Sequence, residues 1–381
     1  FIVYIILISS ISLLPVITAR GLYPIPFQTR KSSPSAPMVL CLKTWKSRTL
    51  PGYYLMRSPK KNILVTGGAG YIGSQFSYDA IDKNYKVIIV DNLSTGKIKL
   101  LPRKATFYKC NISNLKKIDF ILKKHKINNV IHFAASTNVE ESNLNPTKYY
   151  KNNSIATEKL IHICVKNNVK KFIFSSTCAV YGDVNYRVNE DSKCFPKNHY
   201  GMSKLLSEVI LRNSHKENNF SLGILRYFNV IGADKKLRTG LINNNGSLVK
   251  NLVNKIFSKD KTINIFGNDY NTKDKTCIRE FIDINDISKI HLDVLKKLNK
   301  GQSIILNCSY NKSYSVLELI NKFEKVSDIK LKKVFLNRRK GDIKSMQSNN
   351  KNLYKFLKKK YNTNLNQSLK KSLEWYKKIK N

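Results

Sequence analysis

Short apolar segments alternate with longer amphipathic segments along most of the chain. The apolar segments lie at residues 63–65, 86–90, 129–135, 171–176 and 222–227, and helix-like stretches separate them. This alternation is typical of parallel strands joined by crossover helices, which build α/β folds. Ligands in such folds bind beyond the carboxyl ends of the strands, so the polar residues that follow each segment are candidates for a site.

The first apolar segment leads directly into a glycine-rich stretch, TGGAGYIG, at residues 66–73. Gly67 permits a tight turn, Gly70 lets the backbone approach a pyrophosphate at a helix start, and Gly73 allows close packing of that helix on the strand. The next segment ends at Asp91, whose carboxylate can accept hydrogen bonds from ribose hydroxyls and disfavours a 2′-phosphate. The spacing predicts a doubly wound, mostly parallel Rossmann sheet that binds NAD rather than NADP. A smaller, interleaved C-terminal substrate domain is expected beside it.

A second motif, YGMSK, places Tyr200 and Lys204 four residues apart, on one face of a helix. A nearby ammonium lowers the pKa of a phenol, so Tyr200 is expected to act as a base toward a sugar hydroxyl near neutral pH. Thr177 follows the apolar segment 171–176 and can offer its hydroxyl to the same substrate oxygen. We therefore predict Tyr200, Lys204 and Thr177 as the catalytic residues.

The chain is strongly basic, with 68 Lys and Arg against 25 Asp and Glu and a formal net charge of +43. Lys is spread along the sequence and no basic arm with interleaved aromatic residues stands out, so we interpret the excess as solvated surface and expect no nucleic-acid partner. The field still favours an anionic substrate. The seven Cys lack the spacing of a disulfide framework or a zinc site, so no metal is expected.

The N-terminal part has a different composition from the rest. Residues 1–19 are almost all apolar and resemble a signal segment, and residues 20–60 are basic, contain Ser and lack Asp and Glu, as in a transit peptide. This order predicts routing to a plastid by way of the secretory pathway, and a cytosolic protein is the alternative. After removal of this leader we expect no stable membrane span. The rest is predicted to divide into an NAD-binding domain, 61–231, and a substrate-binding domain, 232–381.

The stretches LVTGGAGYIGS, VIIVDNLSTG, VIHFAAS, FIFSSTCAVYGD, YGMSK, LRYFNVIGA and RRKGD occur in this order. Together they resemble the extended short-chain dehydrogenases/reductases, and among these the NAD-dependent nucleotide-sugar epimerases, from Lys61 to about Trp375. The resemblance implies that the NAD site includes, beside the glycine-rich stretch, Tyr71, Ile72, Asp91, Asn92, Leu93, Ser94, Thr95, Gly96, Asn111, Ile112, Phe133, Ala134, Ala135, Ser136, Thr137, Asn152 and Phe228. It implies UDP-sugar contacts from Asn229, Ser247, Leu248, Asn264, Ile265, Phe266, Arg279, Arg339 and Asp342. Guanidinium groups suit a diphosphate, which agrees with the two Arg.

The activity implied by the resemblance is NAD-dependent epimerisation at C4 of a UDP-hexose, the UDP-glucose and UDP-galactose of galactose metabolism, through a transient 4-keto sugar. A homodimer is implied as well. Met346 is expected near the sugar C2, where a flexible side chain leaves room for an N-acetyl group and predicts weaker activity on N-acetylhexosamines. Epimerisation of an N-acetylhexosamine or a pentose as the main reaction is an alternative.

Two further alternatives were weighed on the same residues. A 4,6-dehydratase or decarboxylase of this fold carries an acid beside the catalytic hydroxyl, and Cys178 and Ala179 stand there instead. A non-catalytic nucleotide-binding or RNA-binding module that uses the basic surface predicts loss of Tyr200 or Lys204, and both are present. Both alternatives are therefore disfavoured.

Overall fold

A computed structural model of the protein describes residues 61–243, 246–339 and 342–380. The leader predicted at residues 1–19 and 20–60 lies outside the described residues. No helix in the described part of the chain is long and apolar enough to cross a membrane.

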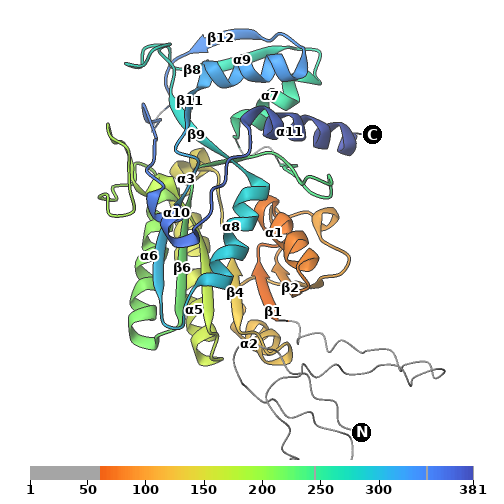
Figure 1. Ribbon diagram of the computed structural model, residues 1–381, viewed down its shortest axis with the longest axis vertical. Helices are drawn as coiled ribbons and strands as arrows, with labels where there is room; N and C mark the ends of the chain where they lie inside the picture. The colour runs from red at the N-terminus through yellow and green to blue at the C-terminus, as the bar shows by residue number, and fades with distance from the viewer. Residues whose placement is uncertain (1–60, 244–245, 340–341, 381) are drawn as a thin grey trace, which may run out of the picture. The chain divides into compact units, whose positions relative to one another are not determined.

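The main sheet has seven strands, and every neighbouring pair is parallel (Figure 1). The strand order is β10-β6-β5-β4-β1-β2-β3. The chain adds β2 and β3 on one side of β1 and β4 and the later strands on the other, so the strand order reverses between β1 and β4. In open sheets of this kind the ligand crevice forms at such a reversal. The strands are β1 (Asn62–Thr66), β2 (Lys86–Asp91), β3 (Thr106–Lys109), β4 (Asn129–His132), β5 (Lys171–Thr177), β6 (Ser221–Tyr227) and β10 (Ser303–Cys308).

Helices cover both faces of this sheet, which is why its strands are apolar on both sides. Leu64 of β1 packs into one hydrophobic core with α2 (Leu115–Lys124), α5 (Ala156–Lys166) and α6 (His199–Asn218). Its neighbours Ile63 and Val65 pack into a second core with α1 (Tyr71–Asp82) and α8 (Ile284–Lys297). The doubly wound, mostly parallel Rossmann sheet predicted from the sequence is therefore confirmed.

A smaller layer lies beyond the carboxyl ends of the main strands (Figure 1). It holds a sheet of β11, β9 and β7, a parallel pair of β12 and β8, and a third hydrophobic core. Its elements are β7 (Asn229–Ile231), α7 (Leu248–Ile256), β8 (Thr262–Phe266), β9 (Ile278–Asp283), β11 (Ser313–Ser315), α9 (Val316–Ser327), β12 (Lys332–Leu336) and α11 (Leu365–Lys380). The shorter elements are η1 (Ile98–Leu100), α3 (Val139–Leu144), α4 (Pro146–Tyr149), the π-helical turn η2 (Tyr150–Ile155), η3 (Cys178–Val180) and α10 (Lys351–Leu357).

The two layers are interleaved along the chain, as predicted. After β9 the chain returns to the main sheet through α8 and β10, then adds α9 and β12 to the smaller layer. The division between residues 231 and 232 stays a prediction. β10 follows that point in the sequence but belongs to the main sheet.

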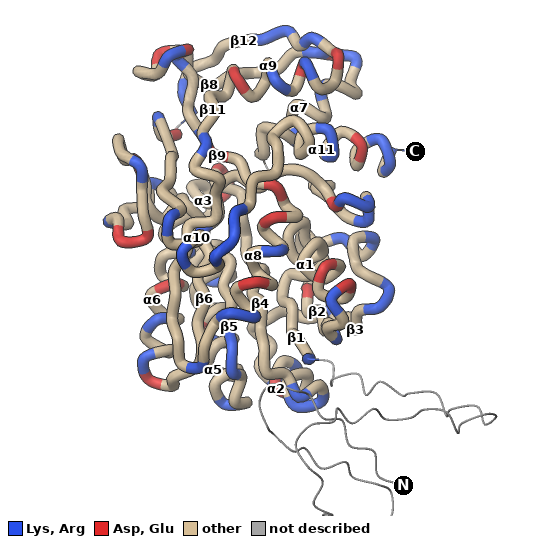
Figure 2. Tube along the Cα trace, viewed as in Figure 1, with Lys and Arg blue, Asp and Glu red and all other residues tan. Residues whose placement is uncertain are grey.

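Two features differ from the sequence-based expectation. The strand predicted at 129–135 ends at His132, and Phe133 to Ala135 follow it as loop residues that line a cavity. The edge strands β3 and β10 were not predicted, although β10 contains the short apolar run at residues 304–306. Figure 2 shows that Lys and Arg are spread over α2, α5, α10, α11 and the loops, and do not form a single arm.

Candidate active site

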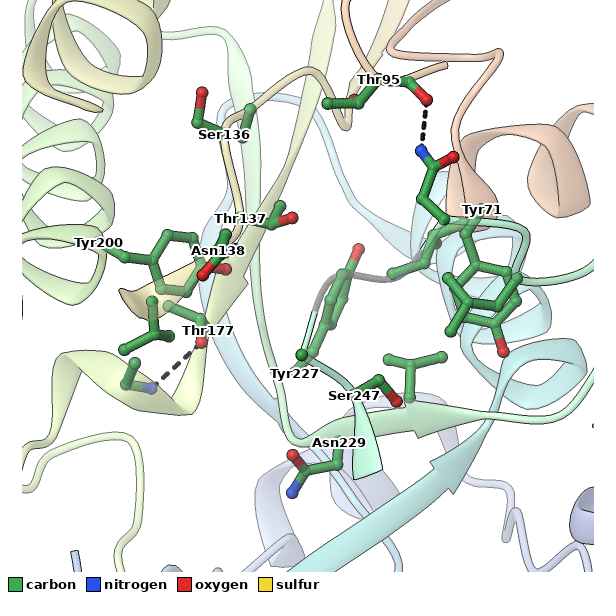
Figure 3. A pocket seen from close by; sticks show the side chains of 18 of the residues that line it. Tyr71, Thr95, Ser136, Thr137, Asn138, Thr177, Tyr200, Tyr227, Asn229 and Ser247 are labelled. Atoms are coloured by element: carbon green, nitrogen blue, oxygen red, sulfur yellow. Dashed lines mark hydrogen bonds between the residues drawn. The ribbon is translucent and has the colours of Figure 1, made fainter. Parts of the chain in front are cut away.

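One cavity of about 1270 Å³ lies where the main sheet meets the smaller layer. It brings together all of the predicted site residues except Leu93 and Gly96. Figure 3 shows Tyr71 and Thr95 on one side of this pocket, Tyr200 and Thr177 on another, and Asn229 and Ser247 below. Residues far apart in the sequence therefore line a single site.

The glycine-rich turn forms one end of the cavity. Gly67 has a φ of +71°, which favours glycine, and its N–H donates to Val90 O at 2.8 Å. A Cβ on Gly73 would lie 2.3 Å from Gly67 O, so only glycine lets α1 start this close to the turn. Gly70 precedes α1 without a side-chain cap, which leaves first-turn N–H groups to bind an anion. This geometry fits the pyrophosphate of a dinucleotide.

Asp91 stands beside this turn at the end of β2 and is 8% exposed. Its Oδ2 accepts from Ala69 N at 3.0 Å and its Oδ1 from Leu93 N at 2.8 Å. Burial raises the pKa of this carboxyl, although both backbone bonds act in the opposite direction. Each oxygen keeps a lone pair for a ribose hydroxyl, so Asp91 fits the predicted role.

The prediction that Leu93 and Gly96 line the site needs correction. The backbone of Leu93 has a φ of +62° and turns its N–H toward Asp91, while Gly96 packs against Ala69 and the Asp91 carboxylate. Both residues position Asp91 from behind and do not line the cavity wall.

The loop after β4 carries Phe133 to Thr137 and is held by a residue that sequence reasoning missed. Asn153, in η2, accepts from Ser136 N at 2.8 Å and donates to Ser136 O at 3.0 Å. Its amide also donates to Ser203 Oγ of α6 at 3.0 Å. The π-helical turn brings Asn152 to the cavity and Asn153 to this loop, and such turns are frequent at functional sites. The stretch YKNNS at residues 150–154 was the available signal.

The YGMSK motif lies at the start of α6. Asn198 caps this helix by accepting from Gly201 N at 2.8 Å, which places Tyr200 in the first turn and Lys204 on the same face. Both side chains line the cavity, and Lys204 Nζ lies 4.2 Å from the centroid of the Phe174 ring. The predicted pairing of the two residues on one helix face is confirmed.

Burial dominates the ionisation of both groups. It raises the pKa of Tyr200 to about 12, despite a lowering interaction with the Thr177 hydroxyl. It lowers the pKa of Lys204 to about 7, although Glu208 raises it. The predicted lowering of the Tyr200 pKa is therefore not found, because desolvation disfavours the charged form of each group.

Thr177 ends β5 and faces the same part of the cavity as Tyr200 (Figure 3). Its Oγ1 accepts from Ala179 N at 3.1 Å, which orients the hydroxyl at the strand end. Cys178 also lines the cavity, and burial raises the pKa of its thiol to about 12. The thiol is therefore protonated and is a poor acid at neutral pH.

The far end of the cavity is basic. Arg279, on β9, donates to Ile278 O and Ile343 O at 2.9 Å each, and lies 3.7 Å from Asp342 Oδ1. Arg339 stacks over the Phe266 ring at 3.7 Å. Two oriented guanidinium groups at one end of a cavity suit a diphosphate. Within the described residues no three His, Cys, Asp or Glu side chains gather as a metal site.

Asn243 was not predicted as a site residue, and the structure adds contacts for the predicted Asn229 and Asn111. Asn243 donates to Thr95 O and so bridges the smaller layer and the loop after β2. Asn229 Nδ2 is occupied by Glu280 O at 2.9 Å, which leaves its carbonyl oxygen as an acceptor. The Asn111 side chain accepts from Ser113 N at 2.9 Å, so its amide NH₂ remains available to a ligand.

Comparisons with known proteins agree with this geometry. The model of the NAD dependent epimerase/dehydratase family matches residues 63–309. The chain is 36% identical over 283 residues to the UDP-glucose 4-epimerase of Azospirillum brasilense, covering 74% of this chain and 81% of the relative. It is 31% identical over 363 residues to UDP-arabinose 4-epimerase 1 of Arabidopsis thaliana, covering 91% and 87%. The crystal structure of the Bifidobacterium longum UDP-glucose 4-epimerase in complex with NAD+ and UDP is similar with a TM-score of 0.80 and 30% identity, covering 84% of this chain and 99% of that one.

Proposed function

Because the chain belongs to the NAD dependent epimerase/dehydratase family, we propose that it inverts C4 of a UDP-hexose and interconverts UDP-glucose and UDP-galactose. One observation carries this proposal. Tyr200, Lys204 and Thr177 lie in the same cavity as a dinucleotide-binding turn and the two guanidinium groups of Arg279 and Arg339. This activity places the protein in galactose metabolism.

The reaction assigns a separate task to each part of the cavity. NAD, when bound, supplies the hydride acceptor for C4 and returns the hydride afterwards. Tyr200 takes the proton of the sugar 4-hydroxyl, Thr177 hydrogen-bonds the same oxygen, and Lys204 stabilises the phenolate. The cavity must let the resulting 4-keto sugar rotate, so that its other face would meet NAD bound at the glycine-rich turn, and Tyr200 then returns the proton to the 4-oxygen. Arg279 and Arg339 hold the diphosphate while the sugar turns.

Elimination of water from the sugar is not supported by the site. That reaction needs a second acid and base beside the catalytic hydroxyl. Cys178 and Ala179 follow Thr177, and the buried Cys178 thiol has a pKa of about 12. Epimerisation needs no group beyond Tyr200 for proton transfer, and this agrees with the residues present.

The proposal is tested by incubating the purified protein with UDP-galactose and separating the products by chromatography. We expect UDP-glucose at equilibrium without added oxidant and with NAD retained by the protein. A 4-keto-6-deoxy sugar as the product would assign the protein to the dehydratases instead, and unchanged substrate would refute the proposal.

A pentose nucleotide is the second candidate substrate. The relative named UDP-arabinose 4-epimerase 1 aligns with 91% of this chain. Parallel reactions with UDP-galactose, UDP-arabinose and UDP-N-acetylgalactosamine at equal concentration rank the candidates by kcat/KM. We expect UDP-galactose to rank first.

We also propose a homodimer formed through α6 and the neighbouring η2. Ile155, Leu206 and Val209 are 47%, 40% and 43% exposed on these two adjacent elements, which is unusual for large apolar side chains. Light scattering should give twice the chain mass, and Leu206→Lys should give a monomer. A wild-type monomer at micromolar concentration would contradict the proposal.

The leader is proposed to route the protein to a plastid through the secretory pathway, on the basis of its composition. A tagged full-length protein should then mature to a start near residue 58. The sequons at Asn219 and Asn366 are exposed, whereas Asn152 lines the cavity and donates to Ser136 Oγ. Glycosylation at the two exposed sequons would mark passage through the lumen, and a uniformly cytosolic, uncleaved protein would refute the routing.

A further inference from the structure

A buried ion pair lies directly behind the catalytic residues of α6. Glu208 follows Lys204 by four residues, so Tyr200, Lys204 and Glu208 share one helix face. Arg226 of β6 donates from Nε to Glu208 Oε1 at 3.0 Å and from Nη2 to Oε2 at 2.7 Å. Glu208 is 1% exposed and Arg226 is 3% exposed. Charges buried in this way are little screened by salt, so they act on the neighbouring catalytic groups.

Glu208 also binds the strand that carries the catalytic hydroxyl. Ser176 Oγ donates to Glu208 Oε1 at 2.5 Å, and Ser176 immediately precedes Thr177 on β5. One carboxylate therefore contacts β5 and belongs to the helix of Tyr200. Its position sets how Thr177 and Tyr200 lie relative to each other.

We propose that Glu208 is a positioning residue. Through its contact with Ser176 it fixes the position of Thr177 relative to Tyr200. Its carboxylate, which pairs with the buried Arg226, also stabilises the charged form of Lys204. The role in turnover rests on the proposed function, whereas the effect on Lys204 can be measured without it.

The other titratable groups that face Lys204 and Tyr200 do not change charge between about pH 5 and 9, given their shifted values. His132 of β4 has a pKa lowered to about 3 by burial and by Lys204. Burial raises the pKa of Cys178 to about 12 and that of Tyr227, on β6, well above its usual value. Burial likewise raises the pKa of Tyr149, whose ring lies 6.5 Å from that of Tyr200. The charge next to Lys204 is therefore set by the ion pair.

Three variants separate the charge of Glu208 from its contact with β5. Glu208→Gln keeps the side-chain length but removes the carboxylate that pairs with Arg226, and it should lower the pKa of Lys204 by about one unit. The double variant Glu208→Gln/Arg226→Gln removes the cation as well and should recover part of that shift. Ser176→Ala breaks the contact with β5 without altering charge. It should reduce kcat about tenfold through misplacement of Thr177, with no shift in pKa.

The pKa of Lys204 is measured by NMR titration of protein labelled with ¹³C-lysine, using the resonance absent from Lys204→Met. The pH dependence of kcat on UDP-galactose is recorded for the same variants. In Glu208→Gln both should move to lower pH by about one unit. A merely structural role would lower kcat at every pH and leave both values in place.

Equal Lys204 pKa values in wild type, Glu208→Gln and the double variant would overturn the electrostatic role. An unchanged kcat in Ser176→Ala would overturn the positioning role. If Glu208→Gln does not fold, the double variant still tests the charge and Ser176→Ala still tests the contact. Wild-type protein without epimerase activity refutes the proposed function, but the NMR titration then still tests the effect of Glu208 on Lys204.

Discussion

Lys204→Met removes the ammonium beside Tyr200 and keeps an unbranched side chain over the Phe174 ring. Lys204 is 3% exposed and has a pKa of about 7, and Tyr200 has a pKa of about 12. In the wild type Lys204 has lost its proton in about half of the molecules at pH 7 and is then a neutral amine. Transfer of the Tyr200 proton to this amine gives a phenolate beside an ammonium. In the variant no amine is present to accept the Tyr200 proton, and no ammonium stabilises the phenolate once it has formed.

We therefore expect kcat at pH 7 to fall by about 10²- to 10⁴-fold, the range that a positioned base contributes. The activity of the wild type should rise with pH through about 7, because the pair loses one proton there. In the variant this rise should continue above about pH 9.

The assay follows UDP-galactose consumption by quenched time points and chromatography, so that no coupling enzyme distorts the pH profile. Lys216→Met, at an exposed position of the same helix, is the matched control. Bound NAD is quantified separately after gel filtration, which distinguishes loss of cofactor from loss of the base. A variant that keeps near wild-type kcat at pH 7, or a rise that stays near pH 7, would refute the assigned role of Lys204.

Three further predictions address the base, the substrate range and stability. Tyr200→Phe should lower kcat by about 10²- to 10⁴-fold and leave NAD bound, because the glycine-rich turn holds the cofactor; near-full activity would exclude Tyr200 as the base. Met346 is 2% exposed and lines the cavity, so Met346→Tyr should abolish activity on UDP-N-acetylgalactosamine and largely spare UDP-galactose; if the wild type does not turn over the N-acetyl substrate, Met346 is not the deciding residue. Burial lowers the pKa of His132 to about 3, so below about pH 6.5 the unfolded chain binds a proton that the folded protein does not, and stability is lost at about 1.4 kcal/mol per pH unit as the pH falls. His132→Gln should remove this contribution, and urea unfolding at several pH values would show an unchanged slope if the reasoning is wrong.

The nucleotide end of the site could be predicted from the sequence because local backbone geometry decides it. The turn after β1 requires glycine at a position of positive φ, Gly67, and at the close approach of α1, Gly73. The spacing of these glycines can be recognised in the sequence. The pairing of Tyr200 with Lys204 is readable for a similar reason, since a helix places residues four apart on one face.

Other parts of the fold and site had no local signal. The strands β3 and β10 are short or half-polar edge strands, and their place in the sheet depends on pairing with distant partners. Asn153 contacts Ser136 and Ser203 across 17 and 50 residues of sequence, so its role follows from where α6 packs. Leu93 and Gly96 were placed at the cavity by motif alone, although they act behind Asp91.

The sequence by itself determined the fold class, the preference for NAD and the pairing of Tyr200 with Lys204 on one helix face, because each depends on periodicity or spacing within a few turns of chain. Only the tertiary structure decided the ionisation of those residues. Burial lowers the pKa of Lys204 to about 7 and raises that of Tyr200 to about 12. The packing of β6 against α6 places Arg226 in contact with Glu208 behind them. Desolvation depends on how completely distant segments cover a side chain, and that quantity appears only when the chain is folded.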